Sequence, residues 1–554
     1  MPMSLRPAEA LVPAVLILLL SVLGGCAQQQ PLPADPTGRL FGRALDDISD
    51  FYIAPVSSRR LALAATARLG ELDPQLAVWE TPGPGDSTEL TLDYRGREVT
   101  TYPNPKHDDP HVWGGWLGHV VADAKNASPT LAGTPDDEID EALFDGITGA
   151  LDRFSRYASP AAAREHRAAR DGFGGIGVTL DPSPDRFQIV KLTPGAPADL
   201  AGIRVGDTIV AIDGRPTAGW ARSDVVDALR GPVLSPVAVT VERPGTPGPH
   251  QYQLQRVLIV EPTVTVSDSG GVAVFHISSF NQDTTQQLVA DLRAAERGPG
   301  PALRGVVLDL RGDPGGLLDQ AVSLADVFIA KGPIVATIGR NPAARQFFEA
   351  SGDSVAPTIP IVVLVNGGSA SASEIVAASL QDAGRAVVVG TASYGKGTVQ
   401  TVLRLPNHGE LTLTWALLVA PAGYLLNTHG VVPTVCTSDL GDDPAALQTA
   451  LARAGGAAVP SPLTDRPRAT LDNADWLRLR ASCPPRLGDR AIDLAVAERL
   501  LADPQLYSQA VHAIAGTASL AARPQRPSTA ADPVLTGAAL TAKPGALFLQ
   551  PPHP

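Results

Sequence analysis

Two short stretches rich in glycine and serine hold the residues with the clearest potential for chemistry. The first, Asn366–Ile375, contains Ser369, Ser371 and Ser373 and follows the apolar run Ile361–Val365. A strand that leads into a helix places these serines at the turn, where backbone N–H groups at the helix start lack intrahelical acceptors. Such N–H groups can stabilise a developing oxyanion, so a serine here is a candidate nucleophile.

The second stretch, Thr391–Gln400, holds Lys396 between Gly395 and Gly397. A lysine acts as a general base only when it is neutral, and burial lowers its pKa because the charged form loses hydration. Glycines on both sides permit the close packing that such burial requires. We therefore expect a buried lysine that can take a proton from a serine.

The segment around these stretches alternates short, Val-rich strands with helices, which predicts a largely parallel α/β layer. Its expected elements are strands at 272–277, 305–310, 361–365 and 386–389, helices at 284–295, 317–329 and 373–380, and a strand pair at 411–419. Residues 174–260 contain about five short β-like runs and two helices, which is typical of a compact β-rich module. Helices are also expected within 40–72, 136–154 and 491–515, with a hairpin at 88–101.

The two stretches together resemble the active site of the carboxyl-terminal processing, or tail-specific, serine protease family. The resemblance covers roughly half of the chain in the family's order and rests on 151–157, 173–178, 308–318, 369–375, 394–400 and 430–433. It implies a serine endopeptidase with a mixed-sheet α/β Ser–Lys protease core, an inserted β-rich PDZ domain and helical terminal segments, in an α/β and α+β multidomain architecture. It implies no metal and no organic cofactor.

Carried over by position, the resemblance makes Ser371 the nucleophile and Lys396 the general base, 25 residues later. Ser369 and Ser373 remain rivals, since either can cap the following helix. The remaining matches are Gln400 as the residue that orients the base, the N–H groups of Ala372 and Gly316 as the oxyanion hole with Gly315 left open, and Asp382 at the position of an acidic helper in some members.

Two departures from the family pattern stand near these sites. Arg311–Pro314 replaces the family's usual paired asparagines in the loop that shapes the oxyanion hole, and Val233–Pro236 replaces a Gly-Thr turn in the β-rich module. That module resembles a PDZ domain. Its loop of Gly175, Ile176, Gly177 and Val178 would capture a peptide's C-terminal carboxylate, with Val225 and Leu229 facing the peptide's apolar end.

Other readings compete with a Ser–Lys protease. A PDZ adaptor that keeps a protease-like frame without cutting is the alternative function, and the altered loop at Asp313 is its main support. His276 lies on an expected core strand, but no triad motif surrounds it, so it is interpreted as a packing residue. His107 and His111 could bind a metal, but no third spaced ligand is evident, which favours a polar loop.

The sequence of the N-terminus resembles an export signal. Arg6 precedes the apolar run Ala10–Leu23, which is shorter than the roughly 20 residues of a spanning helix. The following Gly24-Gly25-Cys26 resembles the bacterial lipoprotein signal, in which Cys26 becomes the lipidated N-terminus; an ordinary signal peptide is the alternative. We expect a periplasmic protein held at a bacterial membrane by lipid. Cys436 and Cys483 either pair there or remain free thiols.

Composition fits this location. The net charge of −13 disfavours nucleic acid as a partner. The expected partners are proteins or peptides with apolar C-termini; an activating protein and the oligomeric state are left open. The expected organisation is a lipoprotein signal peptide at 1–25, a tether at 26–38, a mainly helical region at 39–165, a PDZ domain at 166–260, a protease core at 261–436, a helical region at 437–516 and a disordered tail at 517–554.

Overall fold

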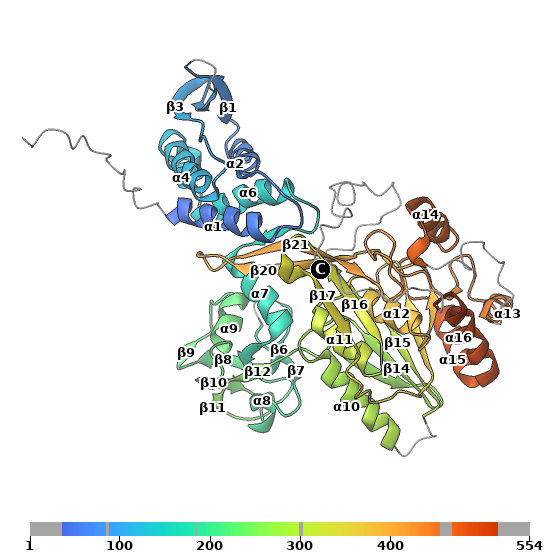
Figure 1. Cartoon of the computed structure of the whole chain (residues 1–554). Helices are drawn as coiled ribbons and strands as arrows, with labels where there is room; N and C mark the ends of the chain where they lie inside the picture. Colours follow the sequence, from blue (N-terminus) through green and yellow to red (C-terminus); the bar gives the residue numbers. More distant parts are fainter. Residues whose placement is uncertain (1–35, 85–87, 184–185, 299–302, 455–467, 519–554) are drawn as a thin grey trace, which may run out of the picture.

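The computed structural model describes residues 36–84, 88–183, 186–298, 303–454 and 468–518 (Figure 1). The expected signal peptide with Cys26, most of the tether and the tail beyond Ala518 lie outside the described residues. Within the described part of the chain, no helix combines the length and apolar character needed to cross a membrane.

The N-terminal unit packs helices against a small antiparallel sheet. Its helices are α1 (Pro36–Phe51), α2 (Ser58–Ala67), α3 (Leu69–Leu72), α4 (Pro110–Ala127), α5 (Pro129–Gly133) and α6 (Asp136–Gly149), and its strands are β1 (Leu76–Pro82), β2 (Thr88–Tyr94) and β3 (Arg97–Pro103). Helix α1 therefore begins inside the last residues of the expected tether. A Cβ added at Gly114 of α4 would lie 2.2 Å from the backbone N of Gly42, so these helices cross at a point where only glycine fits.

The next unit is the β-rich module. A four-stranded sheet in the order β11 (Pro249–Gln255), β10 (Pro236–Glu242), β8 (Thr208–Ile212) and β9 (Arg215–Pro216) is joined by the pairs β5 (Phe173–Gly175) with β12 (Val257–Ile259) and β6 (Val178–Leu180) with β7 (Ile189–Leu192), and by α8 (Pro197–Leu200) and α9 (Arg222–Leu229). On β10 the alternate residues Val237, Val239 and Val241 are buried, which is the period-2 pattern of a sheet with one covered face.

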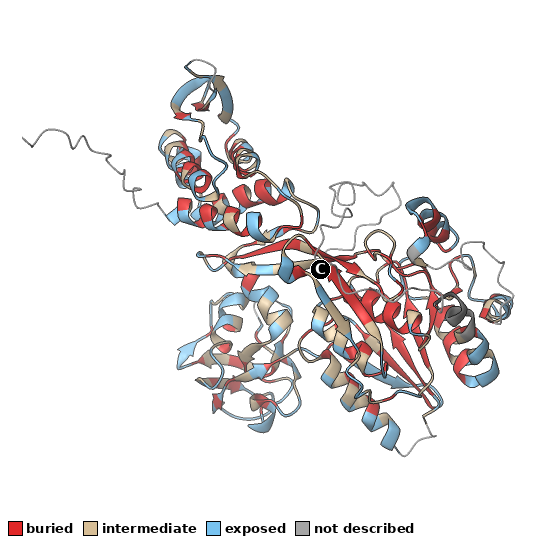
Figure 2. Ribbon diagram, in the orientation of Figure 1, coloured by how far each residue is buried: buried red, intermediate tan, exposed pale blue. Residues whose placement is uncertain are grey.

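The core is a six-stranded sheet with one antiparallel edge strand. Its order is β13 (Val264–Asp268), β14 (Val272–Ile277), β15 (Gly305–Asp309), β18 (Ile361–Val365), β19 (Val387–Gly390) and β22 (Val435–Cys436), and β14 to β22 run parallel. The predicted parallel α/β layer is therefore confirmed. Figure 2 shows these strands as the most continuously buried part of the molecule.

Two layers of helices cover this sheet. Val306 and Leu308 of β15 pack into one hydrophobic cluster with α10 (Thr284–Arg297), α11 (Leu318–Asp326) and α12 (Ala372–Asp382), whereas Val307 packs into a second. The second cluster contains α13 (Pro444–Ala452), α15 (Ala491–Ala502) and α16 (Pro504–Ala518). A parallel sheet needs both faces covered, so the C-terminal helices are an integral layer of the core.

A second sheet connects the units. Its order is β17 (Gln346–Glu349), β16 (Pro333–Ile338), β21 (Glu410–Val419) and β20 (Thr398–Arg404), and β4 (Arg156–Ala158) pairs with β21. Helix α7 (Pro160–Asp171) then leads from β4 to the β-rich module, and Figure 1 shows it between that module and strands β20 and β21. The remaining described elements are the short helix 342–344, the turn 468–470 and α14 (Asn473–Ala481).

Candidate active site

The three serines of the first stretch have different environments. Ser369 and Ser373 are fully buried, and their Oγ atoms donate to the backbone oxygens of Leu310 at 2.7 Å and Asp313 at 3.0 Å. Ser371 is half-buried at the start of α12, with φ of 55° and ψ of −110°. A positive φ is unusual for serine and turns the residue outward from the sheet edge. Of the three, Ser371 lines the cavity that also contains Lys396.

That cavity has a volume of about 430 Å³. Ser371, Ala372, Lys396 and Gln400 share it with the loop of Gly315 and Gly316. The structure therefore brings together all five residues that the sequence singles out for catalysis. Its other walls come from β4 and α7, through Arg156, His166 and Arg170, and from the β20–β21 pair.

Lys396 is held in a setting that favours its neutral form. The pKa of its ammonium group is lowered to about 8, first by burial and then by the positive charges of Arg156 and Arg153, while the negative charge of Glu374 opposes the change. Its Nζ lies 5.6 Å from the ring centre of Phe154. A lysine with this pKa is partly deprotonated near neutral pH and can serve as a base.

Glu374 joins the two candidate catalytic stretches to each other. Its fully buried carboxylate accepts hydrogen bonds from the backbone N–H of Ser371 at 2.8 Å, of Gly395 at 2.7 Å and of Lys396 at 2.9 Å. The hydroxyl of Ser393 also donates to it. Burial raises the pKa of Glu374, while these hydrogen bonds favour the ionised form. The residue lies inside the serine motif, but its role depends on contacts that the sequence alone does not reveal.

The loop opposite Ser371 contains two glycines, Gly315 and Gly316, whose N–H groups are candidates for the oxyanion hole. The N–H of Gly315 donates to Asp313 Oδ1 at 2.7 Å and is therefore engaged. Within the described residues, the N–H groups of Gly316 and Ala372 have no recorded hydrogen bond. A Cβ added at Gly315 would lie 2.8 Å from the Ala372 nitrogen, so the two donor segments are in close contact.

Two other candidates, Gln400 and Asp382, have clear positions. Gln400 lies at a bulge of β20, and its Nε2 donates to the hydroxyls of Thr398 at 2.8 Å and Thr414 at 3.4 Å. Asp382 is outside the cavity and bonds Arg468 at 3.2 Å and the Ala422 N–H at 3.0 Å. Burial raises the pKa of Asp382.

The interpretation of His276 as a packing residue is wrong, because its side chain is 44% exposed and points away from the core beside Asp309. Val272 and Val274 lie on the same face of β14 and are buried, so the exposure on this face is confined to His276 near the carboxyl end of the strand.

The stretch around His107 and His111 forms a helix start. Asp109 caps α4 by accepting from the N–H groups of His111 at 2.9 Å and Val112 at 3.1 Å, and Pro110 occupies the first turn. No cluster of three or more metal-ligating side chains occurs in the described part of the chain.

The expected carboxylate loop joins β5 to β6. Ile176 packs in the module's core with Val225 and Leu229 of α9, and the N–H groups of Ile176 and Gly177 have no recorded hydrogen bond among the described residues. Gly177 has φ of 79°, and a Cβ there would lie 2.3 Å from the Cβ of Ala196. Glycine is required at this position for both reasons.

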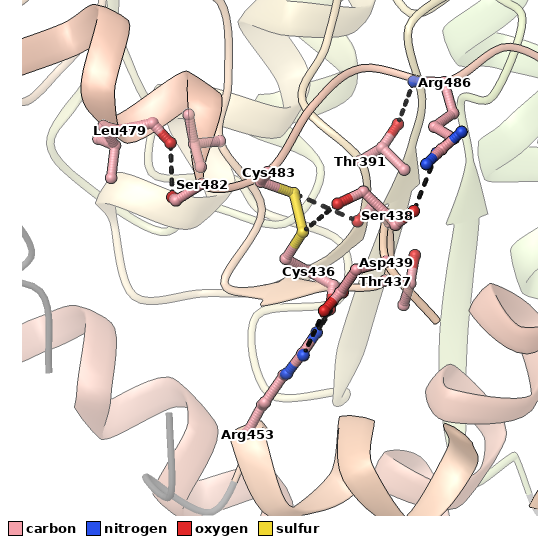
Figure 3. The surroundings of a disulfide bond; sticks show 12 residues. Thr391, Cys436, Thr437, Ser438, Asp439, Arg453, Leu479, Ser482, Cys483 and Arg486 are labelled. Carbon is pink, nitrogen blue, oxygen red and sulfur yellow. Dashed lines mark hydrogen bonds and ion pairs between the residues drawn. A yellow bond between two sulfur atoms is a disulfide. The ribbon is translucent and has the colours of Figure 1, made fainter. Parts of the chain in front are cut away.

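Cys436 and Cys483 form a disulfide, which settles the alternative that the sequence leaves open (Figure 3). The bond ties the end of β22 to the segment after α14. Helix α14 and that segment both contact the candidate catalytic stretches: Arg480 of α14 donates to the Ser393 oxygen at 2.9 Å, and the oxygen of Arg486, in the segment, accepts from the Gly367 N–H at 2.7 Å. No sequence motif marks Arg480 or Arg486.

Comparison with known proteins places these features in a family. Residues 271–437 match the model of peptidase family S41, and residues 188–243 match a PDZ domain. A carboxy-terminal-processing protease from Bartonella bacilliformis is 38% identical over 304 residues, covering 54% of this chain and 70% of that protein. A probable CtpA-like serine protease from Staphylococcus aureus is 34% identical over the same length, covering 60% of that protein.

The solved structure of a photosystem II D1 C-terminal processing protease is 30% identical, covers 54% of this chain and 80% of that chain, and has a TM-score of 0.30.

Proposed function

The chain belongs to peptidase family S41, a family of serine-type peptidases, and on that premise we propose that it cleaves peptide bonds with Ser371 as nucleophile and Lys396 as general base. The observation that carries the proposal is one cavity lined by Ser371, Lys396, Gly316 and Ala372, with burial holding the pKa of Lys396 at about 8.

The proposed reaction has two halves. Ser371 Oγ attacks the peptide carbonyl carbon while neutral Lys396 takes the hydroxyl proton, and the N–H groups of Gly316 and Ala372 bind the resulting oxyanion. The C–N bond breaks, and Lys396 passes its proton to the leaving amine, which leaves an acyl-enzyme on Ser371. Water then attacks the ester with the same lysine as base, and the new carboxylate departs as Ser371 regains its proton.

Gln400 and Glu374 act through the lysine in this scheme. Glu374 fixes the backbone on both sides of the reaction, at Ser371 and at Lys396. Gln400 lies in the cavity with its Nε2 committed to two threonines, which leaves its Oε1 to orient the lysine or a water. Neither residue changes its covalent bonding.

Substrates are proteins selected by their C-terminal tails. A free carboxylate would bind the loop Gly175–Val178, with the tail added as a strand beside β6. The supports are the match to a PDZ domain and the uncommitted N–H groups of Ile176 and Gly177 among the described residues.

Export is part of the proposal. The sequence around Cys26 supports processing before that residue, a lipid anchor and a periplasmic location, with domains divided near residues 38, 165, 260, 436 and 516. The disulfide is consistent with an oxidising compartment. Equal detergent partitioning of the wild type and Cys26→Ser would contradict the anchor.

The central test is loss of cleavage in Ser371→Ala and in Lys396→Ala. Removing either member of a nucleophile–base pair should lower kcat by roughly 10⁴–10⁶-fold on an unfolded test protein. Ser369→Ala is the matched control for the serine motif, and circular dichroism checks the fold of each variant. Retained cleavage in Ser371→Ala would contradict the assignment, and a wild type that binds tails without cutting them would leave the PDZ adaptor as the function.

A further inference from the structure

Asp313 is a buried carboxyl group beside the proposed oxyanion hole. It lies in the loop between β15 and α11 and has no exposed surface. Its Oδ1 accepts from the Gly315 N–H at 2.7 Å, whereas its Oδ2 is buried with no hydrogen-bond partner among the described residues. An ionised carboxylate with one unbonded oxygen in the protein interior is unfavourable, because its charge loses hydration and that oxygen gains no hydrogen bond.

The backbone of Asp313 anchors the same loop to α12. Its carbonyl oxygen accepts from the Ala370 N–H at 2.9 Å and from the Ser373 hydroxyl at 3.0 Å. The side chain then holds Gly315 from within the loop. Because Gly315 is committed to Asp313, the exposed Gly316 is the loop glycine whose N–H remains for the cavity.

The charged groups on the neighbouring elements are directed elsewhere. Arg311 of the same loop bonds Asp309 and approaches Asp493. On α12, Glu374 binds the 393–396 stretch. Burial raises the pKa of Asp313 to about 8, and the hydrogen bond from the Gly315 N–H and the nearby hydroxyl of Ser373, which itself bonds the backbone oxygen, oppose the rise.

Resting on the proposed function, we propose that Asp313 is a positioning residue that works as a neutral carboxylic acid: it holds the Gly315 N–H so that Gly316 faces the oxyanion, and its ionisation switches the site off.

The physical reason is a conflict of charge. The transition state places negative charge on the substrate oxygen next to this loop, and an ionised Asp313 would add a second buried negative charge that opposes it. Lys396 has the opposite requirement, since it must lose its proton to act as base. Activity should therefore rise as Lys396 deprotonates and fall as Asp313 deprotonates, giving a narrow maximum near the shared pKa values of about 8.

The variant Asp313→Asn separates the deprotonation of Lys396 from the deprotonation of Asp313. Asparagine keeps a carbonyl oxygen for the Gly315 N–H and cannot ionise. In this variant, kcat/KM for a reporter peptide should rise with pH as Lys396 deprotonates and then stay level, instead of falling at least tenfold by two units above the maximum as in the wild type. The wild type and Asp313→Asn should have similar kcat/KM below the maximum.

A second measurement needs no catalysis. An acid whose pKa is higher in the folded protein binds its proton more tightly there, so stability is lost as pH rises from the unfolded value of 3.8 towards about 8. The free energy of unfolding of Asp313→Asn minus that of the wild type should grow across this window and stay constant above it. Urea denaturation at a series of pH values measures the difference.

The controls distinguish this inference from the proposed function. Asp140 is an acid of the N-terminal unit whose pKa burial raises to about 6, and Asp140→Asn should keep the wild-type alkaline fall. An inactive wild type would overturn the proposed function while the denaturation series still tests Asp313. An alkaline fall retained in Asp313→Asn, or a folded Asp313→Asn that is inactive at every pH, would overturn the positioning role.

Discussion

At the scale of single residues, the charged groups around Lys396 set the pH at which this proposed base loses its proton. Arg156 contributes a positive charge to the cavity wall, and that charge lowers the pKa of Lys396. Removing the Arg156 charge should therefore raise the pKa of the Lys396 ammonium group. The working range of the enzyme therefore depends on a residue from β4, far from Lys396 in the sequence.

Arg156→Gln should move the acid limb of kcat/KM to higher pH. A shift of about half a unit corresponds to a roughly threefold loss of activity below the limb. The measurement is a pH–rate profile with a reporter peptide. The matched control is Arg164→Gln, on the neighbouring helix but outside the cavity that contains Lys396. An acid limb of kcat/KM in Arg156→Gln at the same pH as in the wild type, or at a lower pH, would contradict the charge argument.

Residue types in local motifs were predictable, and their partners were not. Gly316, Ser371 and Lys396 follow the strands β15, β18 and β19, and Gln400 lies near the start of β20, so all four line one cavity. The choice of Gly316 over Gly315 depends on one hydrogen bond to Asp313, which only the folded loop reveals.

At the scale of elements, α14, together with the segment that follows it, holds the candidate catalytic stretches from outside the region matched to the peptidase family. Its Arg480 is buried, carries a charge opposite to that of Glu374, and bonds the oxygen of Ser393. The disulfide to Cys436 holds this segment in place (Figure 3). Helical periodicity predicts part of this region, but its docking depends on long-range packing.

Cys436→Ser with Cys483→Ser should lower both stability and turnover. The bond closes a loop with a sequence separation of 47 residues. Such a loop corresponds to about 4 kcal/mol in the chain-entropy model, which is an upper value. Reduction of the wild type should lower the thermal midpoint in the same way. A double variant with wild-type midpoint and kcat would show that packing alone holds the segment.

At the scale of the whole molecule, α7 lies against two cavities. Its residues His166, Ala169 and Arg170 line the catalytic cavity. Arg164, Arg167 and Asp171 line a second cavity of about 610 Å³ that also includes Phe173, Gly174 and Arg230 of the β-rich module. Arg167 is tied to Glu410 of β21 at 2.7 Å, so the helix is fixed to the catalytic half as well. No local pattern in the sequence predicts this shared position.

This arrangement predicts that a bound tail changes turnover at a separate site. A peptide that ends in small apolar residues should raise the cleavage rate of an unrelated reporter, because its carboxylate binds beside α7 and favours one position of that helix over others. The same peptide with an amidated C-terminus keeps its side chains and lacks the charge. We expect the amide to bind at least tenfold more weakly and to leave turnover unchanged.

Arg230 provides the matched variant for this last prediction. Its guanidinium lines the second cavity and pairs with Glu165 of α7 at 2.6 Å, so it joins the β-rich module to that helix. Arg230→Gln removes this link, so it should reduce activation by the acid peptide while keeping cleavage of the reporter alone. Calorimetric titration measures binding, and reporter kinetics at low substrate measure activation. Equal effects of acid and amide on the wild type would contradict carboxylate recognition. Binding of the acid without activation would reduce the PDZ domain to a tether that raises the local concentration of substrate.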